Sequence, residues 1–315
     1  MILEGREKIE ATEALLREAG FAVSQICCSR PSCFDFAARK SKTLILVKLE
    51  LAIDNLSPGN STELKVISEC FSATSILVSE KAREKPLEDD TVYSRYNVSA
   101  MTSKTFENIM LRKKYPLVQA GPGGYYVEID SQAIKRRRQK LGLSVGEMAE
   151  MVGISRRTLY GYEHGMAKAS VAVAYNLAWT LGIPVAESIN ILGKSKGHRT
   201  CFLTKAKRVF AKYKLLQRIS GKFDRYNVKT MKKAPFDFVI AVPEEKMKII
   251  GGVANENERE LNRRVDEILS VSKIVQAHPI LITEEKKLVD KDITCINKEE
   301  LSKIKTPEDL IANAR

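Results

Sequence analysis

Residues Ile134–Gly165 read IKRRRQKLGLSVGEMAEMVGISRRTLYGYEHG, and their glycines and serines divide the stretch into three short helices. Gly142 is expected to stop the first helix. Ser144 and Glu147 have the spacing of a capping box, in which the serine accepts the third amide of the new helix and the glutamate bonds back. Gly153 then supplies the left-handed turn before the third helix. The order of these signals predicts a helix-turn-helix.

The third helix of this motif is predicted to be amphipathic, with a polar outer side and an apolar inner side. Ser155 caps it, while Leu159 and Tyr162 stand at helical spacing and pack on the other helices. The positions expected to face outward are Ser155, Arg156, Arg157, Thr158 and Tyr160. The first residues of such a helix enter the major groove of DNA, where an arginine matches the acceptors of guanine and contributes about 1–3 kcal/mol of base discrimination.

The first helix is predicted to combine an apolar inner side with a basic outer side. Asp130 or Ser131 can cap it, and Ile134 and Leu141 are expected to point inward. The basic residues expected on the outer side are Lys135, Arg136, Arg137, Arg138 and Lys140. Such a side is suited to the phosphates of the duplex.

The net charge of +13 is concentrated in one segment. Between Lys194 and Lys233 there are fourteen lysines and arginines against a single acid, Asp224, so the remaining chain is neutral on balance. A basic excess in one segment is typical of contact with a polyanion, although a solvated helix face at a domain junction would have the same composition. We expect part of this segment to meet DNA phosphates, together with Lys135 and Arg136.

An α/β pattern precedes the helix-turn-helix. The predicted elements are, in order, a helix ended by Gly20, strands over 34–38 and 43–49, a helix over 63–72, a strand over 75–78 and a helix over 103–112. The second strand is apolar enough to be covered on both faces of a sheet. Pro116 and the glycine-rich turn at 120–124 are expected to end this domain.

The same order of elements recurs after the helix-turn-helix. The elements predicted there are a helix over 205–219, strands over 236–242 and 247–250, a helix over 256–273, a strand over 280–282 and a helix over 298–304. Phe-Asp-Phe occurs in both halves, at 34–36 and 236–238. We infer a divergent internal duplication, although a chance likeness of two α/β domains would give the same pattern. The predicted fold class is α/β plus all-α, with domains at 1–118, 132–189 and 195–315.

The composition is that of neither a secreted nor a membrane protein. Charges run through the N-terminal segment, and no apolar run approaches the ~18–20 residues that span a bilayer. The six cysteines lack the spacing of a disulfide framework, and Cys27, Cys28 and Cys33 have no neighbouring histidine or second pair with which to bind a metal. We therefore expect a cytoplasmic protein with reduced thiols and without a metal, a cofactor or a membrane partner.

The central stretch resembles the helix-turn-helix domain of the lambda Cro and phage repressor type over residues 132–189. The matching pattern is Leu143-Ser-x-x-Glu147-Met-Ala149-x-x-Val152-Gly153-Ile-Ser155 followed by Leu159-x-x-Tyr162-Glu163-x-Gly165. The resemblance implies that Arg156 and Arg157 read bases. It also implies that Arg138 of the first helix pairs with Glu163 at the end of the third, which we expect to be a structural pair.

This chain departs from the family pattern at two positions. Val145 stands where many members have a glutamine that contacts phosphate, and Gly161 has no side chain at a third reading position. Tyr160 is the candidate to replace the missing base contact, and Ser144 is retained as an expected DNA contact. A helix-turn-helix used only for protein contact is the alternative, but the arginines on the outer face favour DNA.

The N-terminal domain resembles the restriction-endonuclease and Holliday-junction-resolvase fold, with Asp35 before one strand and Lys48 on the next. Such enzymes need two carboxylates about a metal ion, and the second stands two residues before the lysine, where this chain has Leu46. Glu50, two residues after the lysine on the same strand face, is a shifted acid that we do not expect to replace it. The second copy retains Asp237 but has neither acid nor lysine on the matching strand. No catalytic or metal-binding residue is therefore predicted.

Such a domain before a Cro-type helix-turn-helix is similar to a set of archaeal transcriptional regulators, through Pro31-Ser-Cys-Phe-Asp35 and Gly121-Pro-Gly-Gly-Tyr-Tyr126. We predict a sequence-specific regulator of transcription that binds double-stranded DNA through residues 155–163 and is not an enzyme. A homodimer is expected because one reading helix covers only a few base pairs. A metal-dependent nuclease or repair enzyme of the PD-(D/E)xK type is the alternative, while stacking aromatics for an RNA-binding module are not evident.

Overall fold

The computed structural model of the chain describes residues 2–193, 219, 221–223, 226–242, 247–254, 260–283, 293–304 and 306–312. The chain folds into two compact units. The first contains Met1–Glu50, Asn55–Leu77 and Leu192–Arg315, and the second contains Leu51–Asp54 and Val78–Ile191. Most of the basic segment from Lys194 to Lys233, with all but the last residue of the helix expected over 205–219, lies outside the described residues. The three domain bounds remain a prediction.

The N-terminal part of the first unit is an α/β layer in which the strands lie in the order β1-β2-β3-β4. Its elements are α1 (Ile2–Glu18), β1 (Ala22–Val23), β2 (Phe36–Lys40), β3 (Thr43–Leu49), α2 (Pro58–Phe71) and β4 (Thr74–Val78). The antiparallel pair β2 and β3 carries the buried run Leu44–Val47, as its continuous apolar sequence predicts. Helix α2 begins five residues before the predicted start, because Ser57 caps it and Pro58 occupies the first turn.

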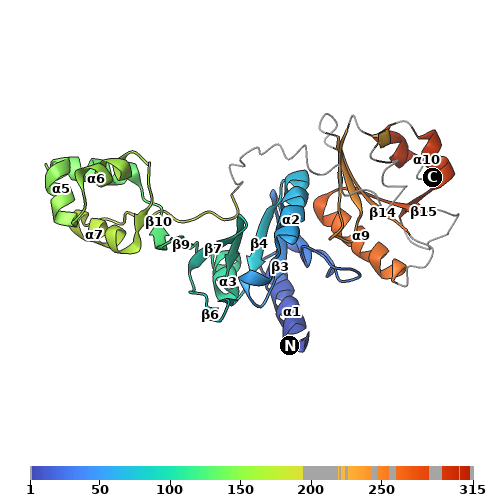
Figure 1. The fold of residues 1–315 in the computed structure, drawn as a ribbon, viewed down its shortest axis with the longest axis horizontal. Coiled ribbons are helices and arrows are strands. Elements are labelled where there is room, and N and C mark those ends of the chain that lie inside the picture. Colours follow the sequence, from blue (N-terminus) through green and yellow to red (C-terminus); the bar gives the residue numbers. More distant parts are fainter. Residues whose placement is uncertain are drawn as a thin grey trace. The chain divides into compact units, whose positions relative to one another are not determined.

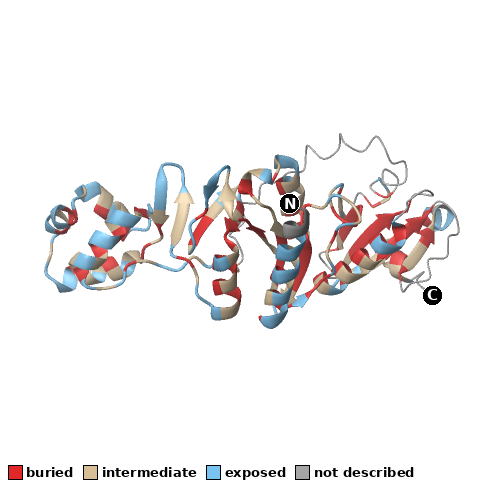
Figure 2. Ribbon diagram, turned by 90° about the horizontal axis from the view of Figure 1, so that it is seen from below, coloured by how far each residue is buried: buried red, intermediate tan, exposed pale blue. Residues whose placement is uncertain are grey.

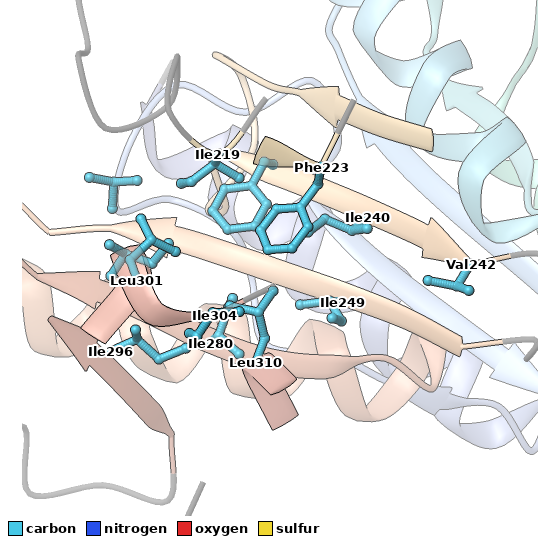
Figure 3. Close-up of a cluster of buried hydrophobic side chains, with 13 residues drawn as sticks. Ile219, Phe223, Ile240, Val242, Ile249, Ile280, Ile296, Leu301, Ile304 and Leu310 are labelled. Atoms are coloured by element: carbon cyan, nitrogen blue, oxygen red, sulfur yellow. The ribbon is translucent and has the colours of Figure 1, made fainter. Parts of the chain in front are cut away.

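The C-terminal part of the first unit is a mixed sheet with the strand order β12-β13-β14-β15-β16 among the described residues. Its elements are β12 (Asn227–Thr230), β13 (Phe238–Val242), β14 (Met247–Val253), α9 (Leu261–Val275), β15 (His278–Thr283), β16 (Thr294–Asn297), α10 (Lys298–Lys303) and α11 (Pro307–Ala312). Helix α9 connects the parallel strands β14 and β15 and packs on both (Figure 1). On this sheet Phe223, Ile240, Ile249 and Ile280 form part of a continuous apolar core (Figure 3).

The two parts of the first unit repeat one backbone register around their aspartates. In each part the aspartate donates its amide to a carbonyl of the neighbouring strand and accepts, on Oδ2, the amide two residues further along that strand. The matching residues are Asp35 with Val47 and Leu49, and Asp237 with Gly251 and Val253. Lys48 therefore corresponds to Gly252. This geometric match supports the inferred duplication more strongly than the shared Phe-Asp-Phe phrase.

The two parts also contact each other in a reciprocal way. A glutamate on a helix of each part accepts two successive backbone amides from the loop before the Phe-Asp-Phe phrase of the other. The pairs are Glu267 with Cys28 and Ser29, at 2.9 and 2.8 Å, and Glu63 with Lys232 and Lys233, at 2.9 and 2.7 Å. The rings of Phe34 and Phe236 meet with centroids 6.4 Å apart. Such reciprocal pairing is the pattern of a two-fold interface, formed here within one chain.

The second unit begins with short strands in the order β8-β7-β9-β10-β11. Its first elements are β5 (Lys81–Ala82), β6 (Lys85–Pro86), β7 (Thr91–Arg95), β8 (Val98–Met101), α3 (Ser103–Arg112), β9 (Val118–Gly121) and β10 (Gly124–Val127). Strands β7 and β8 were not predicted. They form a hairpin whose two turn residues, Tyr96 and Asn97, both have positive φ, and Asn97 was the available sequence signal for that turn. Helix α3 has the predicted bounds.

The rest of the second unit is a helical bundle. It contains α4 (Ser131–Lys140), α5 (Val145–Val152), α6 (Arg156–Glu163), the short β11 (Ala169–Ser170) and α7 (Val171–Leu181). Each helix is buried along one side and exposed along the other (Figure 2). Ile134, Leu159 and Leu177 lie in the common core. The expectation that Leu141 points inward is wrong: it is 43% exposed, because α4 ends at Lys140 and Leu141 is its C-cap. Among the described helices, none is long and apolar enough to span a bilayer.

Candidate nucleic-acid interface

The turn between α5 and α6 sets the direction of the third helix of the motif. Gly153 closes α5 at φ 77°, a left-handed conformation that a side chain would strain. Ser155 then caps α6 by accepting the amide of Thr158 at 3.0 Å, and its hydroxyl lies 2.8 Å from the hydroxyl of Thr158. Leu159 and Tyr162 are buried. The N-terminal end of α6 is therefore fixed by its cap, and its two buried side chains hold the helix against the core of the bundle.

The start of α5 is fixed by the predicted capping box. The amide of Glu147 donates to Oγ of Ser144 at 3.1 Å, and the amide of Ser144 donates to the Glu147 carboxylate at 2.7 Å. Hydrogen bonds to the carboxylate from the hydroxyl and from the amide of Ser144 lower the pKa of Glu147. Ser144 is exposed, so a phosphate can compete with the Glu147 carboxylate for the proton of its hydroxyl.

Arg138 and Glu163 form a buried ion pair that joins α4 to the end of α6. Nε and Nη2 of Arg138 donate to the two carboxylate oxygens at 2.6 and 2.9 Å, and Nη1 donates to the carbonyl of Leu143 at 2.8 Å. The hydrogen bonds that Arg138 donates to Glu163 raise the pKa of Arg138. Arg138 therefore does not belong to the basic outer side of α4, where composition alone placed it. Nε of Arg137 donates to the carbonyl of Leu181, so this side chain is also directed away from the basic outer side of α4.

The predicted reading residues lie along the outer side of α6. Arg156 and Arg157 are exposed in its first turn, next to the exposed cap Ser155, whereas Thr158 is half-buried. Tyr160 is 50% exposed and its ring stacks on that of His164 with centroids 3.9 Å apart. Nδ1 of His164 lies 2.7 Å from the carbonyl oxygen of Tyr160. These residues form one polar face that can meet the edges of bases.

Lys135 and Arg136 are positioned by α4 rather than by the reading helix. Lys135 is half-buried, and Arg136 is exposed with its Nε 3.2 Å from the carbonyl of Gln132. A long basic side chain tied to its own helix in this way can swing to a phosphate without repacking the core. Because Lys135 and Arg136 lie on α4 and not on the reading helix, their position suits contact with DNA phosphates and not with bases.

Two residues that shape the reading face were not found from the sequence. Gly146 lies in the first turn of α5, and a Cβ built there would come within 3.0 Å of Nε of Arg156. Glycine in a helix interior is unfavourable, so its presence was a signal for close packing. His164 was signalled by the i, i+4 spacing from Tyr160, at which aromatic rings meet on a helix.

The nuclease-like cluster of the first unit consists of Asp35, Lys48 and Glu50. Nζ of Lys48 lies 2.9 Å from Asp35 and 3.8 Å from Glu50, and Leu46 is fully buried in the core. Burial opposes the charge of Lys48, but attraction and hydrogen bonding by Asp35 overcome it and raise the pKa of the lysine. Burial raises the pKa of Glu50. Glu50 follows the end of β3, which corrects its predicted place on the strand face.

The second copy fills the corresponding place with arginines. Asp237 accepts Nη1 of Arg30 at 2.8 Å and is also bonded by the buried guanidinium of Arg264 from α9. A Cβ at Gly252, in the register of Lys48, would approach Ile268 at 2.9 Å. The lysine of the first copy is thus replaced by an arginine from a helix. The described residues contain no group of three or more histidines, cysteines or acids placed to hold a metal ion.

These features define a helix-turn-helix protein with an attached endonuclease-like α/β domain. Residues 6–116 match the PD-(D/E)XK superfamily domain, and residues 134–188 match the helix-turn-helix family. The predicted fold class is confirmed. The relatives include proteins of Methanosarcina barkeri (33% identical over 94% of this chain and 92% of the relative), Methanococcus maripaludis (34%, 94% and 93%) and Archaeoglobus fulgidus (30%, 96% and 96%).

Each of these relatives is named "Putative HTH-type transcriptional regulatory protein". The chain belongs to this archaeal family of HTH-type transcriptional regulatory proteins. A chain of the SinR/SinI protein complex is 20% identical and covers 30% of this chain and 93% of its own length, with a TM-score of 0.16. That score is too low to support any statement about this chain.

Proposed function

We propose that the protein is a sequence-specific regulator of transcription that binds double-stranded DNA with α6 in the major groove. The outward position of Arg156 and Arg157 in the capped first turn of α6 carries the proposal, because a guanidinium there can reach the O6 and N7 atoms of guanine. The names of the relatives support a role in transcription. Such a protein works where the DNA is, which fits a cytoplasmic location.

The proposed contacts divide into two groups by the kind of specificity they give. Bases are read by Arg156, Arg157 and Tyr160, and phosphates are bound by Lys135, Arg136, Ser144, Ser155 and Thr158. Thr158 is the weakest member, because it is half-buried and its hydroxyl bonds to Ser155. Phosphate contacts fix the register of the protein on the duplex, and base contacts choose the sequence.

Selection of bound duplexes from a random pool, at a stated salt concentration, tests the proposal. We expect one preferred sequence, with Arg156→Ala and Arg157→Ala each relaxing the preference at defined positions by about 1–3 kcal/mol. Lys135→Ala is the matched control: it should weaken binding to all sequences alike and reduce the salt slope by about one unit. If the arginine variants lose affinity equally for selected and random duplexes, they do not read bases.

We also propose that the protein acts as a homodimer. A single helix such as α6 contacts only a few base pairs, and two-fold related half-sites supply the remaining specificity. The selected sequence should then be a palindrome with half-site centres about 10 base pairs apart or a multiple of this spacing. A single unrepeated half-site in the selected pool would contradict the dimer while leaving DNA binding intact.

We propose further that the endonuclease-like domains do not cut DNA. Both oxygens of Asp35 are engaged, one by Lys48 and the other by the amide of Leu49, and a buried leucine, Leu46, occupies the place of the second acid. Incubation with supercoiled, branched and single-stranded DNA in Mg²⁺ or Mn²⁺ should leave every substrate intact. Cleavage that is lost in Asp35→Ala or Lys48→Ala would establish the alternative, a metal-dependent nuclease.

A further inference from the structure

Helix α7 exposes a stripe of large apolar side chains that its own bundle does not cover. Val171, Tyr175 and Trp179 follow one another at intervals of four residues, which places them on one face of the helix. They are 41%, 66% and 80% exposed. The rings of Tyr175 and Trp179 stack at 19° with centroids 6.5 Å apart. Trp179 is the single tryptophan of the chain.

A hollow of about 340 Å³ lies beside this stripe. Its lining consists of Tyr175, Ala178, Trp179, Gly182, Ile183 and Pro184. None of these side chains is charged, and neither is any residue of α7. An apolar hollow next to a projecting indole has the shape of half of a self-complementary contact, in which the projection of one copy fills the hollow of the other.

The proposed homodimer makes a second copy the occupant of this surface, and the charge of the chain restricts where that copy can bind. Two copies with a net charge of +13 each repel one another, so a stable contact between them must lie where the surface carries no charge. The residues of the α7 stripe and those that line its hollow are uncharged, and one cation lies at the edge: Arg137, whose Nε donates to the carbonyl of Leu181 and whose Nη2 would lie 3.9 Å from a Cβ at Gly182. A nucleic acid, by contrast, would need several basic side chains on this face.

The two aromatic side chains of the stripe supply about half of the area that a stable dimer needs. Tyrosine and tryptophan bury roughly 150–250 Å² each, so two copies that cover both aromatics remove roughly 600 Å² or more from water. This is about half of the ~1,200 Å² at the lower end of stable interfaces, and Val171, Ile183 and Pro184 add to it. The first unit, in contrast, already uses its reciprocal Glu63 and Glu267 contacts within one chain.

We propose that the α7 stripe binds the same stripe of a second copy about a two-fold axis, with Trp179 of each copy seated in the hollow of the other. This inference rests on the proposed function, because the dimer presents two α6 helices to one duplex. It names the surface through which the homodimer forms.

Sedimentation and intrinsic fluorescence of the full chain test the proposal together. On dilution the mass should fall from two chains to one, and the emission of Trp179 should shift to longer wavelength over the same concentration range. Trp179→Ala should raise the dissociation constant of the dimer by about 30-fold or more, as for a buried aromatic hot spot. Met166→Ala, which removes a side chain that is 70% exposed outside α7, is the matched control and should leave the dimer unchanged.

Two results would overturn the inference. One is a chain that stays monomeric at ~100 μM, well above the micromolar range of weak specific complexes, both free and on the selected duplex. The other is a dimer that Trp179→Ala does not weaken. The affinity of monomeric Trp179→Ala for a single half-site distinguishes the two proposals. If this variant still binds the half-site, the absence of a dimer contradicts only the α7 surface and not DNA binding. A dimer that binds no duplex would instead contradict the proposed function and support the surface.

Discussion

The guanidinium of Arg156 lies against the backbone of Gly146: a Cβ on this glycine would come within 3.0 Å of Nε and 3.1 Å of Cζ. The first turn of α5 therefore leaves room, by its glycine, for the side chain of an arginine of α6 to lie across it.

Replacing Gly146 by alanine should displace the Arg156 side chain without unfolding the motif. Alanine is favoured over glycine by about 1 kcal/mol inside a helix, so a loss of binding could not come from a weaker α5. We expect Gly146→Ala to relax base preference at the same positions as Arg156→Ala, measured by selection from a random pool. The double variant should be no worse than Arg156→Ala alone, because the two changes act through one side chain. An unaltered preference in Gly146→Ala would show that Arg156 does not need its place over the glycine.

The Arg138–Glu163 pair predicts a large loss of stability when one partner is removed. Arg138→Ala leaves a buried carboxylate unpaired, and the cost of breaking a buried pair is about 3–5 kcal/mol. Urea unfolding followed through α4–α6 amide exchange measures it. Lys140→Ala, which removes an exposed charge from the same helix, should cost less than about 0.5 kcal/mol. Arg138→Met combined with Glu163→Leu should recover most of the loss, because an apolar pair leaves no charge uncompensated.

Elements that depend on neighbouring residues were predictable from the sequence. The caps of α5 and α6 are set by Ser144, Gly153 and Ser155, and each of these residues acts on an amide or carbonyl within four positions. The bounds of α3 follow from the same local rules. The helix-turn-helix could therefore be placed before any tertiary contact was known.

Contacts between distant segments were not predictable in the same way. The sequence showed that the second copy lacks the lysine. It did not show that Arg264, 27 residues after Asp237, would bond to that aspartate from α9, because this contact depends on how α9 packs on β14. Leu141 illustrates the opposite error. Its apolar character indicated burial, but the end of α4 leaves it outside the helical repeat.

The capping box of α5 should make the stability of this helix depend on pH. Hydrogen bonds from Ser144 hold the pKa of Glu147 below its ordinary value of 4.5. The stabilisation is therefore complete above pH 4.5 and is lost as the pH falls through the lower pKa of the folded state. Amide exchange of α5, corrected for intrinsic rates, should show faster opening in acid than at pH 7. Glu147→Gln can still form a capping box but cannot titrate, so its α5 should show a smaller dependence on pH. Equal pH dependence in both proteins would contradict this role of the carboxylate.

The reciprocal contacts of the first unit predict a change in thiol reactivity. Burial raises the pKa of Cys28, Glu267 raises it further, and Arg263, whose Nη2 lies 2.6 Å from the sulfur, partly opposes both. Glu267→Gln removes the negative charge and leaves the arginine, so the pKa should fall. More thiolate is then present at pH 8, and alkylation of Cys28, followed by peptide mass spectrometry, should be faster.

Glu63→Gln is the control that the internal symmetry provides. Glu63 holds two amides of the other part just as Glu267 does, so both variants weaken the contact between the two parts in a similar way. Only Glu267 acts on Cys28, however, because Glu63 acts on Cys33, where burial raises the pKa and the charge of Glu63 raises it further. Faster alkylation of Cys28 in Glu267→Gln but not in Glu63→Gln would therefore come from the local charge. Equal acceleration in both would mean that the parts separate, and that the reciprocal glutamates hold the first unit together rather than tune one thiol.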